Sequence, residues 1–429
     1  MTNEPAFQHE INLNLNIRSL KPSATLLINE RSNALIQAGR KVYKLGLGQS
    51  PFPVPEPVVE ALRLHAPQKD YLPVKGLPAL REAICGFYER VAGVRHHPDY
   101  TVIGPGSKEL LFLLQLVYYG ELVIPTPSWV SYAPQARIIG RNIHWVPTLK
   151  QNHWLLMPDE LEKLCAEDPT CPRLLILNYP NNPTGYTYTP QQLADIASVA
   201  RKYKVIVVAD EIYGLLHHQQ QHSSIAPYYP EGTILSGGLS KWCGAGGWRL
   251  GTFSFPKQLD WLAESIAVAA SETFTSTSAP IQYAAIAAFL PNPAISHYLN
   301  KACRILHQLG QRCNAILNTT GIANEPPQGG FYLFPDFSKY AAHLAARGIH
   351  TSRQLAETLL EETGVALLPG TEFGRPAQEM TLRLSYVNFD GCAAIAAAET
   401  EEVNAQFLQT YCGHTVEAME VLAGWFLGL

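Results

Sequence analysis

One lysine and one arginine lie in the glycine-rich segment GGLSKWCGAGGWRLG (residues 237–251), directly after a short aliphatic run. A single lysine in a loop is ordinarily a surface cation, but a lysine withdrawn from water can form a Schiff base with an aldehyde. The repeated glycines let the backbone approach a bulky anion, and the planar guanidinium of Arg249 suits a phosphate. Lys241 and Arg249 together therefore fit a phosphorylated aldehyde.

Two further polar side chains come at the end of the run VIVVADEIY (residues 205–213). Asp210 follows the aliphatic residues, where a carboxylate either caps a helix or partners a cationic ring nitrogen. Tyr213 either packs near the edge of a sheet or gives its hydroxyl to a cofactor oxygen. From these residues alone, both interpretations stay open.

The elements that must position these side chains are short buried strands alternating with polar helices. Aliphatic or β-branched runs at residues 174–178, 205–210 and 233–236 predict strands, and residues 190–203 predict a helix between two of them. This alternation indicates parallel β-α-β units. Ligands bind beyond the carboxyl ends of such strands, so we expect a site in residues 178–185, 210–213 and 237–249.

The two ends of the chain differ from this middle part. Before about residue 57 the sequence is irregular and rich in Pro and Gly, and after about residue 300 it reads as helix, strand (330–335), helix, strand (381–387). We therefore predict an α/β fold: a large domain with a mostly parallel sheet flanked by helices, and a smaller α+β domain built from both termini. The expected division is residues 1–57, 58–300 and 301–429.

The segment NYPNNPTG (residues 178–185) adds a motif that identifies a family. N-N-P-T-G, D-E-I-Y, S-K and G-W-R-L-G follow one another in this chain as in the fold-type I, pyridoxal-phosphate-dependent aminotransferases of class I/II. The resemblance runs from about residue 19 to residue 388, and the motifs are most similar to those of bacterial aspartate and prephenate aminotransferases. It implies the cofactor pyridoxal 5'-phosphate.

The resemblance assigns the central roles residue by residue. Lys241 becomes the catalytic Schiff-base lysine, Asp210 the partner of the pyridinium nitrogen, and Tyr213 and Asn182 the donors to the phenolic oxygen of the ring. A carboxylate beside the ring nitrogen keeps that nitrogen protonated, so that the ring accepts electrons when the substrate α-carbon loses its proton. Hydrogen bonds to the phenolate stabilise its negative charge.

The same resemblance implies a phosphate cup and a stacking residue. A helix whose first N–H groups and dipole favour an anion is expected to begin within IGPGSKELL (residues 103–111), at residues 106–108. The residues implied to bind the phosphate are Gly106, Ser107, Lys108, Ser240 and Arg249. Trp129 matches the aromatic residue that stacks on the cofactor ring, although an isolated tryptophan is by default a core residue.

Two positions outside the central segment complete the implied site. Arg383, in TLRLSY (residues 381–386), resembles the arginine that binds the substrate α-carboxylate, and a charge between two leucines needs a partner or water. Tyr71 resembles a residue that reaches the cofactor phosphate of the neighbouring subunit. This second match implies a homodimer with shared active sites.

The N-terminal segment SLKPSAT (residues 19–25) bears on the substrate. Lys21 and Thr25 match residues that approach the substrate side chain in the aspartate and prephenate enzymes, and Lys108 matches a lysine facing a distal carboxylate. The full implied set of substrate contacts is Lys21, Thr25, Gly48, Lys108, Trp129, Asn182 and Arg383. Cations in a pocket otherwise lined by aromatic groups would select an acidic substrate. The alternative is that Lys21 is a surface cation and Lys108 touches only water or phosphate.

Several departures from the family concern the shape of the pocket. Gly246 replaces threonine, residues 242–244 (Trp-Cys-Gly) replace smaller or differently shaped residues, and residues 49–51 (Gln-Ser-Pro) replace Glu-Pro-Asp. Gly238 stands where some aspartate enzymes have a phosphate-binding serine. We expect ping-pong transamination from an L-amino acid, acidic and aspartate-like, to a 2-oxo acid such as 2-oxoglutarate. The alternatives are an aminotransferase for aromatic or other amino acids, and a carbon-sulfur lyase with the same cofactor.

Composition excludes other classes. The 429 residues are 47% hydrophobic with a net charge of -4, and no basic block suggests nucleic acid as a partner. The apolar stretch at residues 110–119 is shorter than the roughly 20 residues of a membrane span, and the N-terminus lacks a secretory pattern, so we expect a cytoplasmic protein. The 8 cysteines form no C-x-x-C pair, and we expect no metal. HHQQQH (residues 217–222) is expected to be a solvated loop, and residues 415–429 to dock on the protein body.

Overall fold

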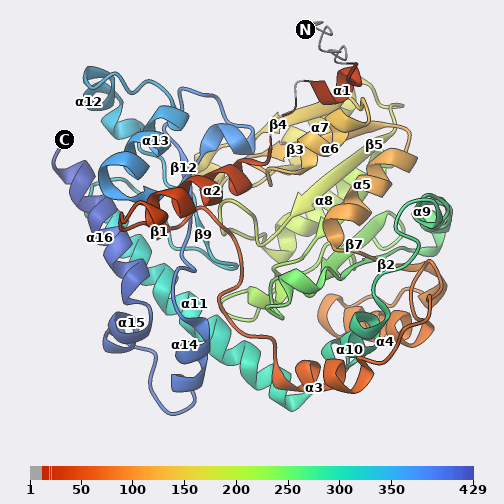
Figure 1. Cartoon of the computed structure of the whole chain (residues 1–429). Helices are drawn as coiled ribbons and strands as arrows, with labels where there is room; N and C mark the ends of the chain where they lie inside the picture. Colours follow the sequence, from red (N-terminus) through yellow and green to blue (C-terminus); the bar gives the residue numbers. More distant parts are fainter. Residues whose placement is uncertain (1–11, 19, 21) are drawn as a thin grey trace, which may run out of the picture.

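The computed structural model describes residues 12–18, 20 and 22–429. Its central feature is a seven-stranded sheet in the order β2-β8-β7-β6-β5-β3-β4, in which β3 to β7 run parallel and β8 runs antiparallel to its two neighbours. The strands are β2 (Thr101–Gly104), β3 (Glu121–Thr126), β4 (Ile143–Pro147), β5 (Arg173–Asn178), β6 (Ile206–Asp210), β7 (Thr233–Gly238) and β8 (Gly251–Ser254). The mostly parallel sheet predicted from the sequence is confirmed, and Figure 1 shows it in the right half of the molecule.

Both faces of this sheet are buried, which explains why its strands read as continuous apolar runs. In β5, Leu174 and Ile176 pack into one core cluster, while Leu175 and Leu177 pack into the other. The first cluster includes residues of α5 (Ser107–Val117), α6 (Tyr132–Ile138) and α9 (Asp260–Ser271). The second includes residues of α4 (Pro78–Ala92), α7 (Pro158–Glu167) and α8 (Pro190–Lys202). Helices therefore cover the sheet on both sides.

The helix expected at residues 190–203 forms as α8, and its start has a local cause. The Thr189 side chain accepts a hydrogen bond from the backbone N–H of Gln192, while the Gln192 side chain accepts one from the backbone N–H of Thr189. This reciprocal cap satisfies two N–H groups that the first helical turn leaves without partners. Pro190 at the first position fits because its missing N–H is not needed there.

A second, smaller region lies on the left of Figure 1 and combines the two ends of the chain. Strand β1 (Tyr43–Lys44) pairs in parallel with β10 (Val365–Ala366), and β11 (Leu368–Pro369), β12 (Leu382–Ser385) and β9 (Tyr332–Leu333) form an antiparallel sheet. The strands expected at 330–335 and 381–387 are present but shorter. Helices α12 (Ala341–Ala346), α13 (Ser352–Thr363), α14 (Gly391–Ala397), α15 (Ala405–Tyr411) and α16 (Gly413–Leu427) belong to this region.

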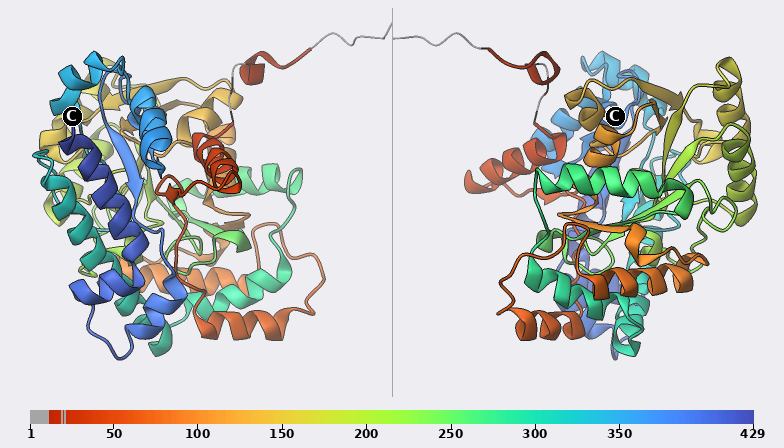
Figure 2. Two further views of the ribbon diagram at one scale, coloured as in Figure 1. Left: turned by 60° about the vertical axis from the view of Figure 1, so that its left-hand side comes forward. Right: turned by 90° about the vertical axis from the view of Figure 1, so that its right-hand side faces the viewer.

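The long helix α11 (Pro293–Asn318) runs along both regions, with α3 (Glu56–His65) and α10 (Ala279–Phe289) near its start (Figures 1 and 2). The proposed boundary between residues 300 and 301 falls inside α11, whereas the pairing of β1 with β10 supports a smaller domain with contributions from both termini. We keep the three-part division as a proposal.

The expectation of an irregular segment before residue 57 is wrong in part. Helix α2 (Ala24–Gln37) occupies 14 of these residues, and the short α1 (Leu15–Arg18) precedes it. The reason is local: the prolines and glycines lie outside ATLLINERSNALIQ, so nothing within this run interrupts the hydrogen bonds of a helix.

The end of the chain docks on the body, as expected. Helix α16 contacts α11 and α13, and the ring of Phe426 stacks on that of Phe337 with centroids 4.0 Å apart. Among the described residues, no helix has the length and apolar character that crossing a bilayer requires.

Candidate active site

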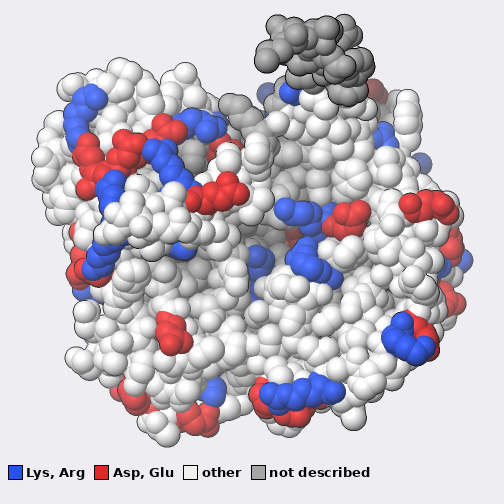
Figure 3. All heavy atoms as spheres, viewed as in Figure 1, with Lys and Arg blue, Asp and Glu red and all other residues white. Residues whose placement is uncertain are grey.

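The segments that follow β5, β6 and β7 converge on a cavity of about 580 Å³, at the edge where the sequence predicts a site. Figure 3 shows a hollow near the middle of the molecule with Lys and Arg atoms in it. The residues that line the cavity are Leu47, Gly48, Gln49, Ser107, Lys108, Trp129, Tyr132, Asn178, Asn182, Asp210, Ile212, Tyr213, Ser240, Lys241, Gly246, Gly247 and Arg249. Most of the residues expected from the sequence are thus brought together.

Lys241 follows β7 in the glycine-rich segment, and its amine is buried in the cavity. The Nζ atom donates a hydrogen bond to the backbone oxygen of Gly48 over 2.8 Å. Burial, together with the positive charges of Arg383 and Arg249, lowers the pKa of Lys241 to about 8. A substantial fraction of this amine is therefore neutral near physiological pH, as a nucleophile or base requires.

Asp210, the last residue of β6, is the carboxylate of the cavity. Its Oδ2 accepts a hydrogen bond of 2.5 Å from the hydroxyl of Tyr132, and its Oδ1 accepts one of 3.4 Å from the hydroxyl of Ser236. Burial raises the pKa of Asp210 to about 6, while these hydrogen bonds act in the opposite direction. A buried carboxylate of this kind is suited to a cationic partner such as a protonated ring nitrogen.

The residues expected to form a phosphate cup lie around the start of α5. Gly106 precedes the helix with a φ of 91°, and Arg249 lies against it. A Cβ atom on Gly106 would lie 2.2 Å from Nη2 of Arg249, and a Cβ on Gly251 would lie 2.0 Å from the backbone nitrogen of Ser107. Both positions therefore require glycine, because any side chain would separate the arginine and the helix N-terminus.

The cations of the cup act on one another. The guanidinium of Arg249 donates to the backbone oxygens of Gly246 over 3.0 Å and Pro105 over 3.3 Å. Burial lowers the pKa of Lys108, and the nearby Arg249 charge lowers it further. Uncompensated positive charge of this kind, next to the free N–H groups of α5, favours a bound anion.

Arg383 comes from strand β12 of the smaller region and is only 2% exposed. Its Nη1 donates a hydrogen bond of 3.0 Å to the side-chain oxygen of Asn182, and its guanidinium lies 4.8 Å from the ring centroid of Tyr332. Within the described part of the chain, its Nε has no hydrogen-bond partner. An unpartnered donor on a buried arginine is suited to a carboxylate.

Tyr332 is one of two residues that the sequence analysis missed. Its hydroxyl oxygen is 2.8 Å from that of Tyr213, and a Cβ on Gly48 would lie 2.0 Å from the hydroxyl oxygen of Tyr332. The other is Tyr132, the partner of Asp210. Its one sequence signal was its place three residues after Trp129. The two residues are joined by a turn, in which the N–H of Tyr132 donates to the backbone oxygen of Trp129, and their rings are in edge contact at 5.2 Å.

Four expected site residues that the structure describes are not among those lining the cavity. Gly106 and Arg383 lie against its residues Arg249 and Asn182, whereas Thr25 and Tyr71 do not. Thr25 lies on α2 and Tyr71 is 91% exposed, and neither lines the cavity. Lys21 lies outside the described residues.

The expectation of a solvated HHQQQH loop is wrong for its first two residues. His217 and His218 are buried, because the chain pairs with the segment around Gly329. Both ring nitrogens of His218 lie 3.0 Å from backbone oxygens, those of Pro327 and Gly330. The described residues contain no group of three or more His, Cys, Asp or Glu that could hold a metal ion.

Comparison with known proteins now decides the family. A family model described as "Aminotransferase class I and II" matches residues 40–397, which is most of the chain. The chain belongs to the class I and II aminotransferases. It is therefore a transaminase, and its cofactor is pyridoxal 5'-phosphate, as the resemblance implied.

Curated members and solved structures agree with this assignment. An aspartate aminotransferase of Geobacillus stearothermophilus is 35% identical over 383 residues, which cover 86% of this chain and 93% of that protein. A probable aspartate/prephenate aminotransferase of Thermus aquaticus is 32% identical, with 87% and 94% covered. The solved aspartate aminotransferase of Thermus thermophilus with maleate matches 97% of this aminotransferase and 100% of that chain, with 28% identity and a TM-score of 0.83.

The side chains of this aminotransferase fit the cofactor. The buried amine of Lys241 suits an aldehyde, the buried carboxylate of Asp210 suits a ring nitrogen, and the anion position between Arg249 and α5 suits a phosphate. All three line or border one cavity, which a cofactor of this shape requires.

Proposed function

We propose that this aminotransferase moves the amino group of an acidic, aspartate-like L-amino acid to a 2-oxo acid such as 2-oxoglutarate. One observation carries the proposal: the positive charges of Arg383, Arg249 and Lys108 all act on the amine of Lys241. A phosphate would compensate part of this charge, and a substrate with two carboxylates would compensate the rest. The names of the relatives support the same substrate class.

Two positions receive the two carboxylates in this proposal. Arg383 binds the α-carboxylate, because its Nε is unpartnered and burial strengthens a charge-assisted hydrogen bond. Lys108 binds the distal carboxylate from beside Trp129, whose ring centroid lies 5.1 Å from the Lys108 Nζ. Gly48, Asn182 and Trp129 border the substrate between them. Lys21 and Thr25 remain predicted contacts.

The proposed chemistry uses the side chains in defined roles. When bound, pyridoxal 5'-phosphate supplies an aldehyde and a ring that withdraws electrons from the substrate α-carbon. Lys241 is the catalytic residue: it anchors the cofactor and then moves a proton from the α-carbon. Asp210 holds a negative charge at the ring nitrogen, and Tyr213 and Asn182 donate to the phenolic oxygen. Gly106, Ser107, Lys108, Ser240 and Arg249 hold the phosphate, and Trp129 stacks on the ring.

We also propose a homodimer in which Tyr71 serves the active site of the neighbouring subunit. A tyrosine that is 91% exposed in the single chain has an unused hydroxyl and an uncovered ring, and a subunit interface would give both a partner. We also propose a location in the cytoplasm, where thiols stay reduced, because all eight cysteines are free.

The test uses the purified holoenzyme and its cofactor absorbance. Aspartate, glutamate, phenylalanine, leucine and cysteine are added singly, and 2-oxoglutarate is then added to each sample whose absorbance changes. We expect aspartate and glutamate to change the absorbance and the oxo acid to restore it. A change with phenylalanine or leucine alone would refute the acidic substrate but keep transamination. Release of sulfide from cysteine without an oxo acid would identify a lyase.

A matched pair of variants tests the distal-carboxylate position. Lys108→Met should raise the KM for aspartate by about tenfold, the loss of one charge-assisted contact, and change the KM for an uncharged donor much less. Lys163→Met removes an exposed lysine on α7 and should leave both values unchanged. An equal effect of Lys108→Met on both donors would assign Lys108 to the phosphate alone.

A further inference from the structure

A second cavity of about 380 Å³ adjoins the first beside the residues that follow β6. Ile212 lines both cavities, so a single side chain forms part of the wall between them. The second cavity is bordered by the neighbours of two active-site residues: Glu211 follows Asp210, and Trp242 follows Lys241. No role in transamination is assigned to this space.

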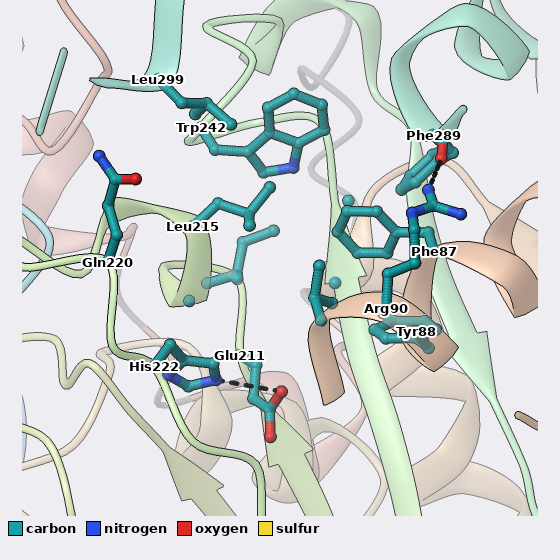
Figure 4. Close-up of a pocket in the computed structure, with 15 residues that line it drawn as sticks. Phe87, Tyr88, Arg90, Glu211, Leu215, Gln220, His222, Trp242, Phe289 and Leu299 are labelled. Carbon is teal, nitrogen blue, oxygen red and sulfur yellow. Dashed lines mark hydrogen bonds and ion pairs between the residues drawn. The ribbon is translucent and has the colours of Figure 1, made fainter. Parts of the chain in front are cut away.

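One end of the second cavity is aromatic and aliphatic. The rings of Phe87 and Trp242 are nearly parallel, at an interplanar angle of 15° and a centroid distance of 6.5 Å, and Phe289 meets both edge to face. Leu215 and Leu299 complete this end (Figure 4). The faces of aromatic rings carry negative electrostatic potential, which attracts cations as well as apolar groups.

The other end holds a buried carboxylate. The side chain of Glu211 is 6% exposed, and its Oε1 accepts hydrogen bonds from the hydroxyls of Tyr179, over 2.7 Å, and Ser224, over 2.6 Å. Its Oε2 lies 3.2 Å from Nε2 of His222, yet neither nitrogen of that ring makes a hydrogen bond in the described part of the chain. Figure 4 shows Glu211 and His222 together at the end of the cavity opposite Trp242.

The positive side chain of this cavity is committed elsewhere. Of the described residues that line it, Glu211 is the one carboxylate and Arg90 the one Lys or Arg. Arg90 is exposed and donates to the backbone oxygens of Gly86, over 2.8 Å, and Phe289, over 2.6 Å. Its charge therefore lies at the solvent side, where water screens it, while the charge of Glu211 is inside.

We propose that the second cavity is an effector site for a small organic cation with an apolar body. The positive group would lie near Glu211, because a buried carboxylate is stabilised by an opposite charge, and the apolar body would lie among Phe87, Trp242 and Leu299. The cavity has the size of a small-metabolite site. An anion would be repelled by Glu211, and a neutral ligand would leave His222 as the one ionisable group of the described cavity lining beside its carboxylate.

Occupancy would be felt at the active site through the shared wall. A ligand against Trp242 and Ile212 constrains the residues next to Lys241 and Asp210, so we expect it to change the rate of transamination. Binding to the second cavity can be tested separately from the proposed substrate, because it is measured without any amino acid present.

The binding experiment titrates the holoenzyme with benzyltrimethylammonium by calorimetry. A quaternary ammonium cannot form a Schiff base with the cofactor, so it reports on the second cavity and not on the aldehyde. Phenylacetate and benzyl alcohol have similar apolar bodies with a negative charge and no charge. We expect the cation to bind at least about tenfold more tightly than either, the weight of one desolvated cation contact. Absence of binding to the folded holoenzyme, or equally tight binding of benzyl alcohol, overturns the proposal. Phenylacetate is compared only by the part of its binding that Leu299→Trp removes, because the cations of the active site also attract a carboxylate.

Two variants locate the bound cation. Glu211→Gln keeps an oxygen for Tyr179 and Ser224 but removes the charge, and should weaken binding of the cation by about tenfold. Leu299→Trp fills the aromatic end without touching Glu211 and should abolish binding. It provides the test on its own if Glu211→Gln does not fold. Glu167→Gln is the matched control, since it removes an exposed carboxylate at the end of α7.

Binding that survives in both Glu211→Gln and Leu299→Trp lies elsewhere and refutes the site. Binding that is lost in these variants, together with a rate of transamination that changes with benzyltrimethylammonium in the wild type only, supports it. Binding with an unchanged rate would refute the effector role.

Discussion

Lys241 combines two properties that depend on each other: its amine is buried, and it is surrounded by positive charge. Both lower its pKa, from the ordinary value of 10.5 to about 8. The neutral amine attacks an aldehyde, whereas the protonated amine does not. We predict that the rate at which the cofactor-free protein takes up pyridoxal 5'-phosphate rises with pH, with a midpoint near 8, and levels off above it.

Stopped-flow absorbance after mixing the cofactor-free protein with pyridoxal 5'-phosphate measures this rate. Lys241→Ala should show no such absorbance change, and Lys163→Ala should behave as the wild type. A midpoint near 10.5 would mean that Lys241 is not withdrawn from water.

Tyr132 acts through Asp210. Its hydroxyl donates to the carboxylate and so favours the charged form, which opposes the burial that raises the pKa of Asp210 to about 6. Tyr132→Phe removes this donor, so the pKa of Asp210 should rise and the acid limb of the kcat profile should move to higher pH. At neutral pH we expect kcat to fall by about tenfold, equivalent to one charge-assisted hydrogen bond.

The pH profile distinguishes this positioning role from a merely structural one. Tyr203→Phe is the matched control, because it removes a hydroxyl that donates to a carboxylate, Glu162, away from the cavity. A lower kcat for Tyr132→Phe with no displacement of the acid limb would contradict the proposed link to Asp210.

At the scale of elements, the junction between α5 and the segment after β7 depends on the absence of side chains. Gly106 has a φ of 91° and lies against Arg249. Gly106→Ala should displace Arg249 from the helix N-terminus and weaken cofactor binding by at least about tenfold, as expected for one lost contact to a phosphate. Equilibrium titration of the cofactor-free variant with pyridoxal 5'-phosphate measures this loss.

Gly348 supplies the control for backbone strain. It has a φ of 77°, and a Cβ there meets nothing within 4 Å. Gly348→Ala should cost about 1–2 kcal/mol of unfolding free energy from the left-handed backbone alone and leave cofactor affinity unchanged. Equal cofactor affinities for the two variants would show that the contact between Gly106 and Arg249 does not hold the phosphate.

At the scale of the whole molecule, the proposed dimer makes each active site depend on two chains. The side chain of Tyr71 is 91% exposed in the single chain and does not line the cavity of that chain. We predict that Tyr71→Ala and Lys241→Ala each lower activity as pure proteins. Refolded together, they should regain activity, because a mixed dimer holds one site with both native residues.

The specific activity of the co-refolded mixture is compared with the sum of the activities of the two separately refolded variants. Sedimentation gives the mass of the protein in solution. Co-refolding Lys241→Ala with Asp210→Ala is the control, because both residues belong to the cavity of one chain and no mixed dimer then holds a complete site. A monomeric mass, or a mixture no more active than the sum, would refute the shared site.

The sequence alone determined those parts of this protein that depend on neighbouring residues. Strands β5, β6 and β7 were predictable because a strand buried on both faces is a continuous apolar run, and α8 because its cap residues, Thr189 and Gln192, are close in sequence. The cluster of Asn182, Asp210 and Lys241 followed from the rule that parallel strands end at one edge. The family motifs lie within these same short segments.

Only the tertiary structure decided which side chains meet across long separations. The pairing of Tyr132 with Asp210, of Tyr213 with Tyr332, and of Arg383 with Asn182 joins residues 78, 119 and 201 positions apart. The buried charge of Glu211 was equally invisible, because burial depends on how Tyr179, Ser224 and His222 fold around it. Periodicity reports which face of an element is apolar, whereas partners across elements are fixed by the packing of the whole chain.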